Sequence, residues 1–145
     1  MAVADEWSGR QAGGKEKKMT PDVLSDRLWK FAVLVGRLVD RLPGTRLGRH
    51  VAGQLVRCGT AAPPNYDEAR SGESKGDFIH KLSIAMKELA ESRGWIRFTL
   101  MAELLPDQEV AAVLDECNQL CRIVGKSLAT AKANRHRPPP TTNNK

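Results

Sequence analysis

Four stretches of this chain repeat apolar side chains at steps of three and four residues, and this repeat limits the fold more than any other feature. Such steps place the side chains along one face of an α-helix, whereas a half-buried β-strand needs alternation every second residue. The stripes are Leu24, Leu28, Phe31, Val35, Leu38 and Leu42; Leu47, Val51, Leu55, Cys58 and Ala62; Phe78, Leu82, Ala85, Leu89, Ser92, Ile96 and Leu100; and Val110, Leu114, Cys117, Cys121, Val124, Leu128 and Ala131. No stretch shows the β-alternation, so the sequence predicts an all-α protein.

Residues that favour helix ends separate the four stripes. Thr20 can cap the first helix with Pro21 at its first position, and Ser74 can cap the third helix through the amide of Asp77. Proline-containing segments at 42–44 and 105–106 end the first and third helices. Long amphipathic helices joined by short turns predict an up-down-up-down, left-handed four-helix bundle over residues 20–134.

The dipeptide Pro63-Pro64 interrupts the second stripe. Proline lacks a backbone N–H and its ring clashes with the carbonyl one turn earlier, so a helix either ends or bends at this point. Residues 65–70 are still typical of a helix. We therefore expect a kinked helix that resumes and continues to Arg70.

The two ends of the chain differ in composition from the middle. Residues 1–19 are polar and glycine-rich and residues 135–145 contain three consecutive prolines, so we expect both segments to be disordered. Trp7 is the exception in the first segment, since it could dock against the folded part. The net charge is +6, and two-thirds of this excess lies in the two end segments, so composition alone does not indicate a strongly basic folded surface.

Membrane and secretory classes do not fit the sequence. No apolar run reaches the length of a membrane span, and the N-terminus carries Asp5 and Glu6 in place of the apolar stretch of a signal peptide. The three cysteines lie at no zinc-finger spacing and are interpreted as reduced thiols. We expect a cytoplasmic protein without a membrane partner.

Three glutamates, Glu68, Glu88 and Glu91, are the best candidates for a metal site in the core of a bundle. Di-metal bundles use Glu-x-x-His on two helices, and no histidine here follows a glutamate at that spacing. The alternative is that these carboxylates pair with Lys87, Lys81 or Arg57 or face solvent. No phosphate-binding glycine loop and no nucleophile–base arrangement is evident. The sequence therefore predicts no enzyme, no metal and no cofactor.

Basic residues gather on the second helix and the turn that follows it. They could contact phosphates without sequence preference. The alternative is a solvated face on which bases alternate with acids. With the basic tail, the candidate nucleic-acid-binding residues are Arg46, Arg49, Arg57, Arg70, Lys75, Lys81, Arg135 and Arg137.

The stretch from Gln54 to Trp95 resembles a bacterial family first noticed as reading frames within intervening sequences of 23S ribosomal RNA genes. The resemblance rests on a helix with Gln-Leu-x-Arg and Asn-Tyr-x-Glu-Ala, a polar turn, and a helix with glutamates at set positions. The matching residues are Gln54, Leu55, Arg57, Asn65, Tyr66, Glu68, Ala69, Ser74, Lys75, Asp77, Phe78, Ile79, Lys81, Leu82, Lys87, Glu88, Glu91, Ser92 and Trp95.

This resemblance implies a non-enzymatic four-helix bundle that assembles into a homo-oligomer, a pentameric ring. A related group serves as accessory protein to the reverse transcriptases of diversity-generating retroelements, which implies RNA, DNA or a reverse-transcriptase-like protein as partner. Asn65, Glu68, Glu88 and Glu91 would then form a structural polar motif. The chain departs from the family pattern at the double proline and at Glu73, which stands where relatives carry a basic residue. The sequence therefore predicts an RNA-associated bundle, with a protein-only scaffold as the alternative.

Overall fold

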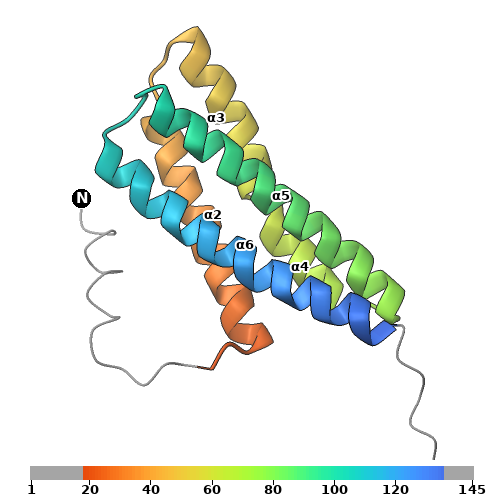
Figure 1. The fold of residues 1–145 in the computed structure, drawn as a ribbon. Coiled ribbons are helices and arrows are strands. Elements are labelled where there is room, and N and C mark those ends of the chain that lie inside the picture. Colours follow the sequence, from red (N-terminus) through yellow and green to blue (C-terminus); the bar gives the residue numbers. More distant parts are fainter. Residues whose placement is uncertain (1–17, 136–145) are drawn as a thin grey trace, which may run out of the picture.

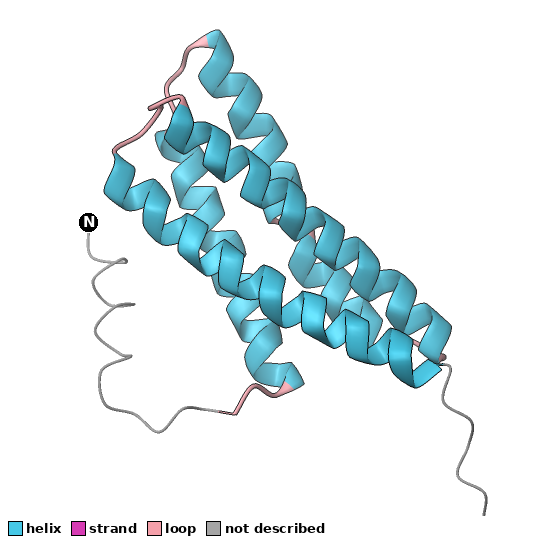
Figure 2. Cartoon of the chain, in the orientation of Figure 1, coloured by secondary structure: helices cyan, strands magenta, loops and turns pink. Residues whose placement is uncertain are grey.

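A computed structural model describes residues 18–135, and every regular element in this part is a helix (Figures 1 and 2). The elements are α2 (Pro21–Arg41), α3 (Arg46–Gly59), α4 (Ala62–Arg70), α5 (Lys75–Met101) and α6 (Asp107–Arg135). Figure 1 shows α3 and α4 following one another along the bundle, so that together they form the second of four antiparallel columns. The prediction of an all-α, up-down-up-down four-helix bundle is confirmed.

Side-chain caps begin three of the helices. The hydroxyl of Thr20 accepts a hydrogen bond from the Val23 amide, and that of Ser74 accepts one from the Asp77 amide, as the sequence predicts. Thr45 caps α3 through the amide of Gly48. Each cap satisfies a backbone donor that has no partner within its own helix.

The second column is broken rather than kinked, so the expected continuous helix is wrong at this point. The helix ends at Gly59 and a new helix begins at Ala62, since Pro63 and Pro64 cannot donate to the carbonyls one turn earlier. The side-chain amide of Asn65 donates to the Ala61 carbonyl over 2.8 Å, beside the backbone N–H of Asn65, which donates to the same carbonyl. The break keeps the chain direction and lets both halves bury apolar faces.

The predicted stripes form the core, and Leu47 is their one exposed member. Leu28, Val51, Leu89 and the other central stripe residues are fully buried. Leu47 is 45% exposed, although the stripe predicts that it is buried, because it lies in the first turn of α3 at the end of the bundle. The third helix ends at Met101, before the predicted proline, and its last turn passes into a loop where Glu103 has a positive φ.

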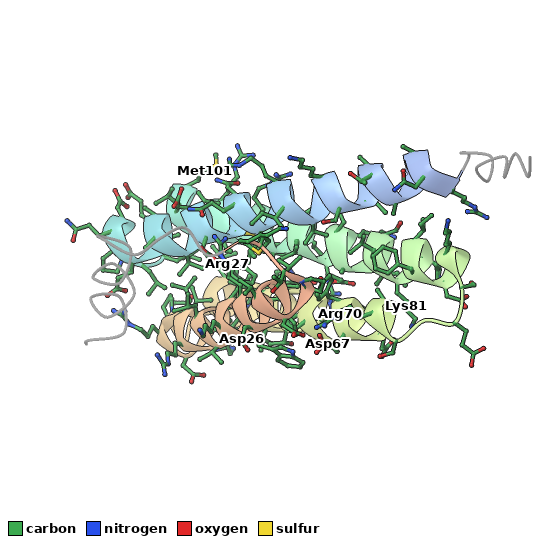
Figure 3. All side chains as sticks on the ribbon, turned by 90° about the horizontal axis from the view of Figure 1, so that it is seen from below. Asp26, Arg27, Asp67, Arg70, Lys81 and Met101 are labelled. Carbon is green, nitrogen blue, oxygen red and sulfur yellow. The ribbon has the colours of Figure 1, made fainter. Side chains whose placement is uncertain are left out.

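A buried ion pair joins the first and last helices. Arg27 of α2 lies between α2 and α6 (Figure 3), where its Nε is 2.8 Å from a carboxylate oxygen of Glu116 and its Nη2 donates to Gln119. The side chain of Glu116 is 6% exposed and that of Arg27 is 17% exposed. Two parallel N–H···O bonds and the Gln119 amide therefore replace the water that both charges lose.

α2 and α3 approach closely at Gly59. A Cβ added to this glycine would lie 2.5 Å from Cγ1 of Val35, whereas one added to Gly36 would meet no atom within 4 Å. The small residue therefore sets the distance between the two helices. The described part of the chain includes no helix that is apolar and long enough to span a membrane.

We predict opposite effects for two glycine substitutions. Gly59→Ala should lower the free energy of unfolding by about 1–3 kcal/mol, because the new methyl group overpacks against Val35. Gly36→Ala should raise it by about 0.5–1 kcal/mol, because alanine favours helix and meets open space. Urea denaturation measures both. Equal effects would show that helix propensity, rather than the close approach, governs Gly59.

We predict that Glu116→Ala lowers the free energy of unfolding by about 3–5 kcal/mol, because it leaves the Arg27 guanidinium buried without a carboxylate. Glu109→Ala is the matched control, since Glu109 pairs with Arg41 at the surface of the same two helices. That variant should lose less than about 1 kcal/mol. Urea denaturation measures both variants. A similar loss of unfolding free energy in both would show that the buried pair stabilises the protein no more than the surface pair does.

Candidate nucleic-acid interface

The predicted phosphate-binding cations do not form one patch. Arg46 and Arg49 lie in the first turn of α3, whereas Arg70 ends α4 and Lys75 begins α5 at the opposite end of the bundle. Arg135 is the last residue of α6 rather than part of the tail, and Arg137 lies outside the described residues. The long axis of the bundle therefore separates the predicted residues into two groups.

Three of these cations are engaged with carboxylates. The Arg57 guanidinium pairs with Glu91 and lies 3.6 Å from Glu88. Nζ of Lys81 is 2.6 Å from Glu68, in the contact between α4 and α5 (Figure 3). Across another contact, Nη2 of Arg70 is 2.6 Å from Asp22. These cations are locally neutralised, which is the alternative that the mixed charge of the sequence left open.

The glutamates of the polar motif are the partners of two of these cations. Glu68, Glu88 and Glu91 bind cations of the neighbouring column and thereby join the second and third columns. Asn65, the fourth member of the motif, pairs with no carboxylate among the described residues: its side-chain amide donates to the Ala61 carbonyl next to the break between α3 and α4. Within residues 18–135, no group of three or more acidic, histidine or cysteine side chains is placed to hold a metal ion.

A second set of cations, on α5 and α6, was missed by the sequence reasoning. Arg93, Arg97, Arg122 and Lys126 have no carboxylate within ion-pair distance among the described residues. Arg93 and Arg122 come from different helices and both lie close enough to Cys121 to act on its thiol. We call these four residues the α5–α6 basic face.

The sequence does carry a signal for part of this face. From Cys117 to the last residue there is no Asp or Glu, whereas six basic residues occur. The acidic residues of α6 all lie in its first ten residues, and two of them, Glu109 and Glu116, pair with α2. α6 is thus acidic in its first part and basic in its second part. The net charge of the whole middle of the chain does not show this difference.

The three cysteines are free thiols in the core. Burial raises the pKa of Cys58, partly opposed by a hydrogen bond with Ser92. The hydrogen bond between Cys117 and Cys121, together with burial, raises the pKa of Cys117. The same hydrogen bond lowers the pKa of Cys121 to about 7, with help from Arg93 and Arg122. Within this pair of thiols the lowered pKa therefore belongs to Cys121, which is 4% exposed.

Aromatic side chains form a small cluster between α3 and α5. The Trp95 ring meets His50 and Phe98 edge to face, with ring centroids 5.7 and 5.6 Å apart. Phe98 is 38% exposed and Met101, one turn later, is 78% exposed and points away from the bundle (Figure 3). On the other side, Trp29 is half-exposed and its indole N–H donates to Asp67 over 2.8 Å. The surface therefore displays apolar groups as well as cations.

Comparison with known proteins identifies one family. The model of the family described as 23S rRNA-intervening sequence protein matches residues 26–126. A crystal structure of a protein of unknown function from the S23 ribosomal protein family of Bacteroides thetaiotaomicron is 25% identical, with a TM-score of 0.71, and the match covers 77% of this chain and 99% of that one. Among curated proteins no sequence matches.

We predict that alkylation of the native protein by iodoacetamide is about a hundredfold slower than alkylation of the unfolded chain, because all three thiols are buried. The reaction should begin at Cys121 and accelerate as the pH rises through about 7, where this thiol ionises. Peptide mass spectrometry gives the order of modification. Fast labelling of Cys58 at neutral pH would contradict the burial of this residue.

Proposed function

From the premise that this chain belongs to the 23S rRNA-intervening sequence protein family, we propose that it is a non-catalytic, homo-oligomeric protein that associates with RNA. The single observation that carries the proposal is the α5–α6 basic face, whose four cations have no carboxylate partner within residues 18–135. Free guanidinium and ammonium groups on two adjacent helices are suited to phosphates, whose binding releases counterions.

The cations predicted from the sequence differ in how readily they could bind phosphate. Arg46, Lys75 and Arg135 are exposed and make no ion pair within the described residues, so they can add phosphate contacts at the two ends of the bundle. Arg57, Arg70 and Lys81 would each have to leave a carboxylate first. We therefore assign the main part of RNA affinity to α5 and α6.

Self-association would increase the effect of a weak patch. A ring of identical subunits, which we propose to be a pentamer, presents the basic face several times and so converts weak contacts into avidity. The free thiols are compatible with a reducing compartment, and we propose that the protein is cytoplasmic.

A protein-only scaffold, or an accessory subunit of a nucleic-acid enzyme such as a reverse transcriptase, is the second candidate. The observation that favours it is the exposure of Phe98 and Met101 on one face and of Trp29 and Val33 on another. Large exposed apolar side chains are typical of protein interfaces. Those groups would bind partner proteins or further copies of this chain without any contribution from the cations.

We predict that the full-length protein binds a fluorescein-labelled RNA hairpin with an affinity that falls steeply with salt, measured by fluorescence anisotropy. Arg97→Gln and Arg122→Gln should each weaken binding by roughly three- to tenfold and reduce the slope of log affinity against log salt by about 0.7–0.9. Removal of residues 136–145 should leave part of the affinity, because the folded face retains its cations.

The matched control is Arg41→Gln, which removes an exposed arginine that is already paired with Glu109. Its effect on affinity should be less than about twofold. Absence of binding by the wild-type protein would contradict the proposal. Recovery of a protein partner that survives nuclease treatment would then favour the scaffold function.

A further inference from the structure

The first and last helices leave a groove at one end of the bundle. α6 has 29 residues and α2 has 21, so the last turns of α6 extend past the start of α2 (Figure 3). The groove has a volume of about 620 Å³ and is bordered by Met19, immediately before α2, by Phe78 of α5 and by Ile123 and Ala131 of α6.

The groove combines an apolar surface with a positive charge. Phe78 and Ile123 are only half-buried here, and both pack against the core. Lys126 also lines the groove and has no carboxylate partner among the described residues. No acidic residue follows in α6, so nothing on its last turns offsets this charge. A matching ligand would carry a large apolar group beside carboxylates.

We propose that the N-terminal segment of this same chain, residues 1–10, binds in the groove. The segment contains Asp5, Glu6 and Trp7 in succession, which supplies two carboxylates for Lys126 and an indole for the surface of Phe78 and Ile123. Trp7 is the sole aromatic residue in the first 17 residues. The Asp5-Glu6-Trp7 triplet is thus complementary to Lys126 in charge and to Phe78 and Ile123 in apolar character.

The length of the chain also favours this occupant. Met19 lies at the border of the groove, so the segment that precedes it starts there. Met19 lies twelve positions after Trp7, and an extended chain of this length spans up to about 40 Å. The intervening residues include Gly9, Gly13 and Gly14, which allow the chain to reverse direction. No second molecule is needed to fill the groove.

Hydrogen exchange of the full-length protein, followed by mass spectrometry, tests this assignment. In Trp7→Ala and in Asp5→Lys/Glu6→Lys, backbone amides of residues 123–134 should exchange about tenfold faster than in the wild type, because the covering segment is lost. Trp29→Ala is the matched control, since it removes a half-exposed tryptophan outside the groove, and it should leave these amides unchanged. Unchanged exchange in both test variants would overturn the proposal.

A disulfide-trapping experiment separates this chain from other occupants. The double variant Ala4→Cys/Thr130→Cys should form an intramolecular disulfide under mild oxidation, because Thr130 borders the groove and the native thiols are buried. Ala4→Cys/Thr60→Cys, with the second cysteine at an exposed position beyond α3, should not. Disulfide-linked dimers in place of the intramolecular product would assign the groove to a second copy and overturn the proposal.

Discussion

The packing of α5 against α6 is the contact on which the rest of the bundle depends. These are the two longest helices, and they contact each other where Gly125 faces the Met86 side chain and where the Cys117 side chain lies against the Leu89 carbonyl. The shorter helices are attached to this pair by specific polar contacts, α2 through Arg27 and Glu116 and α4 through Lys81 and Glu68. Because α2 is shorter, it cannot cover the whole pair, and the groove follows from that difference in length.

Charge on the surface is distributed according to which helices meet. Where α3 or α4 faces α5, and where α2 faces α6, cations and carboxylates come together and neutralise each other. The cations in the basic half of α6 have no carboxylate within ion-pair distance in the described part of the chain. A nearly balanced composition is therefore compatible with a basic face, since pairing removes charge unevenly.

Much of the fold could be predicted from the sequence, but less of the candidate site. The stripes identify Leu28, Val51, Leu89 and Val124 as core because a helical period directly determines which side chains share a face. Leu47 is an exception because burial also requires a neighbouring segment, and in the first turn of α3 it is Gly48, not Leu47, that is buried. The two prolines predict a disturbance of the second helix, but they do not decide between a bend and a break, because proline is compatible with either.

The local sequence determined four helical columns, their caps and the apolar faces that form one core, because helix period and capping depend on residues a few positions apart. Tertiary structure alone decided which cations are paired, because Arg57 and Glu91, or Arg27 and Glu116, meet only after the helices have packed. It also decided how far α2 extends along α6, and the groove lies where α2 no longer covers α6. Whether a cation is paired, and whether a groove forms, depends on residues that are distant in the sequence. A local sequence pattern does not specify which of these residues meet.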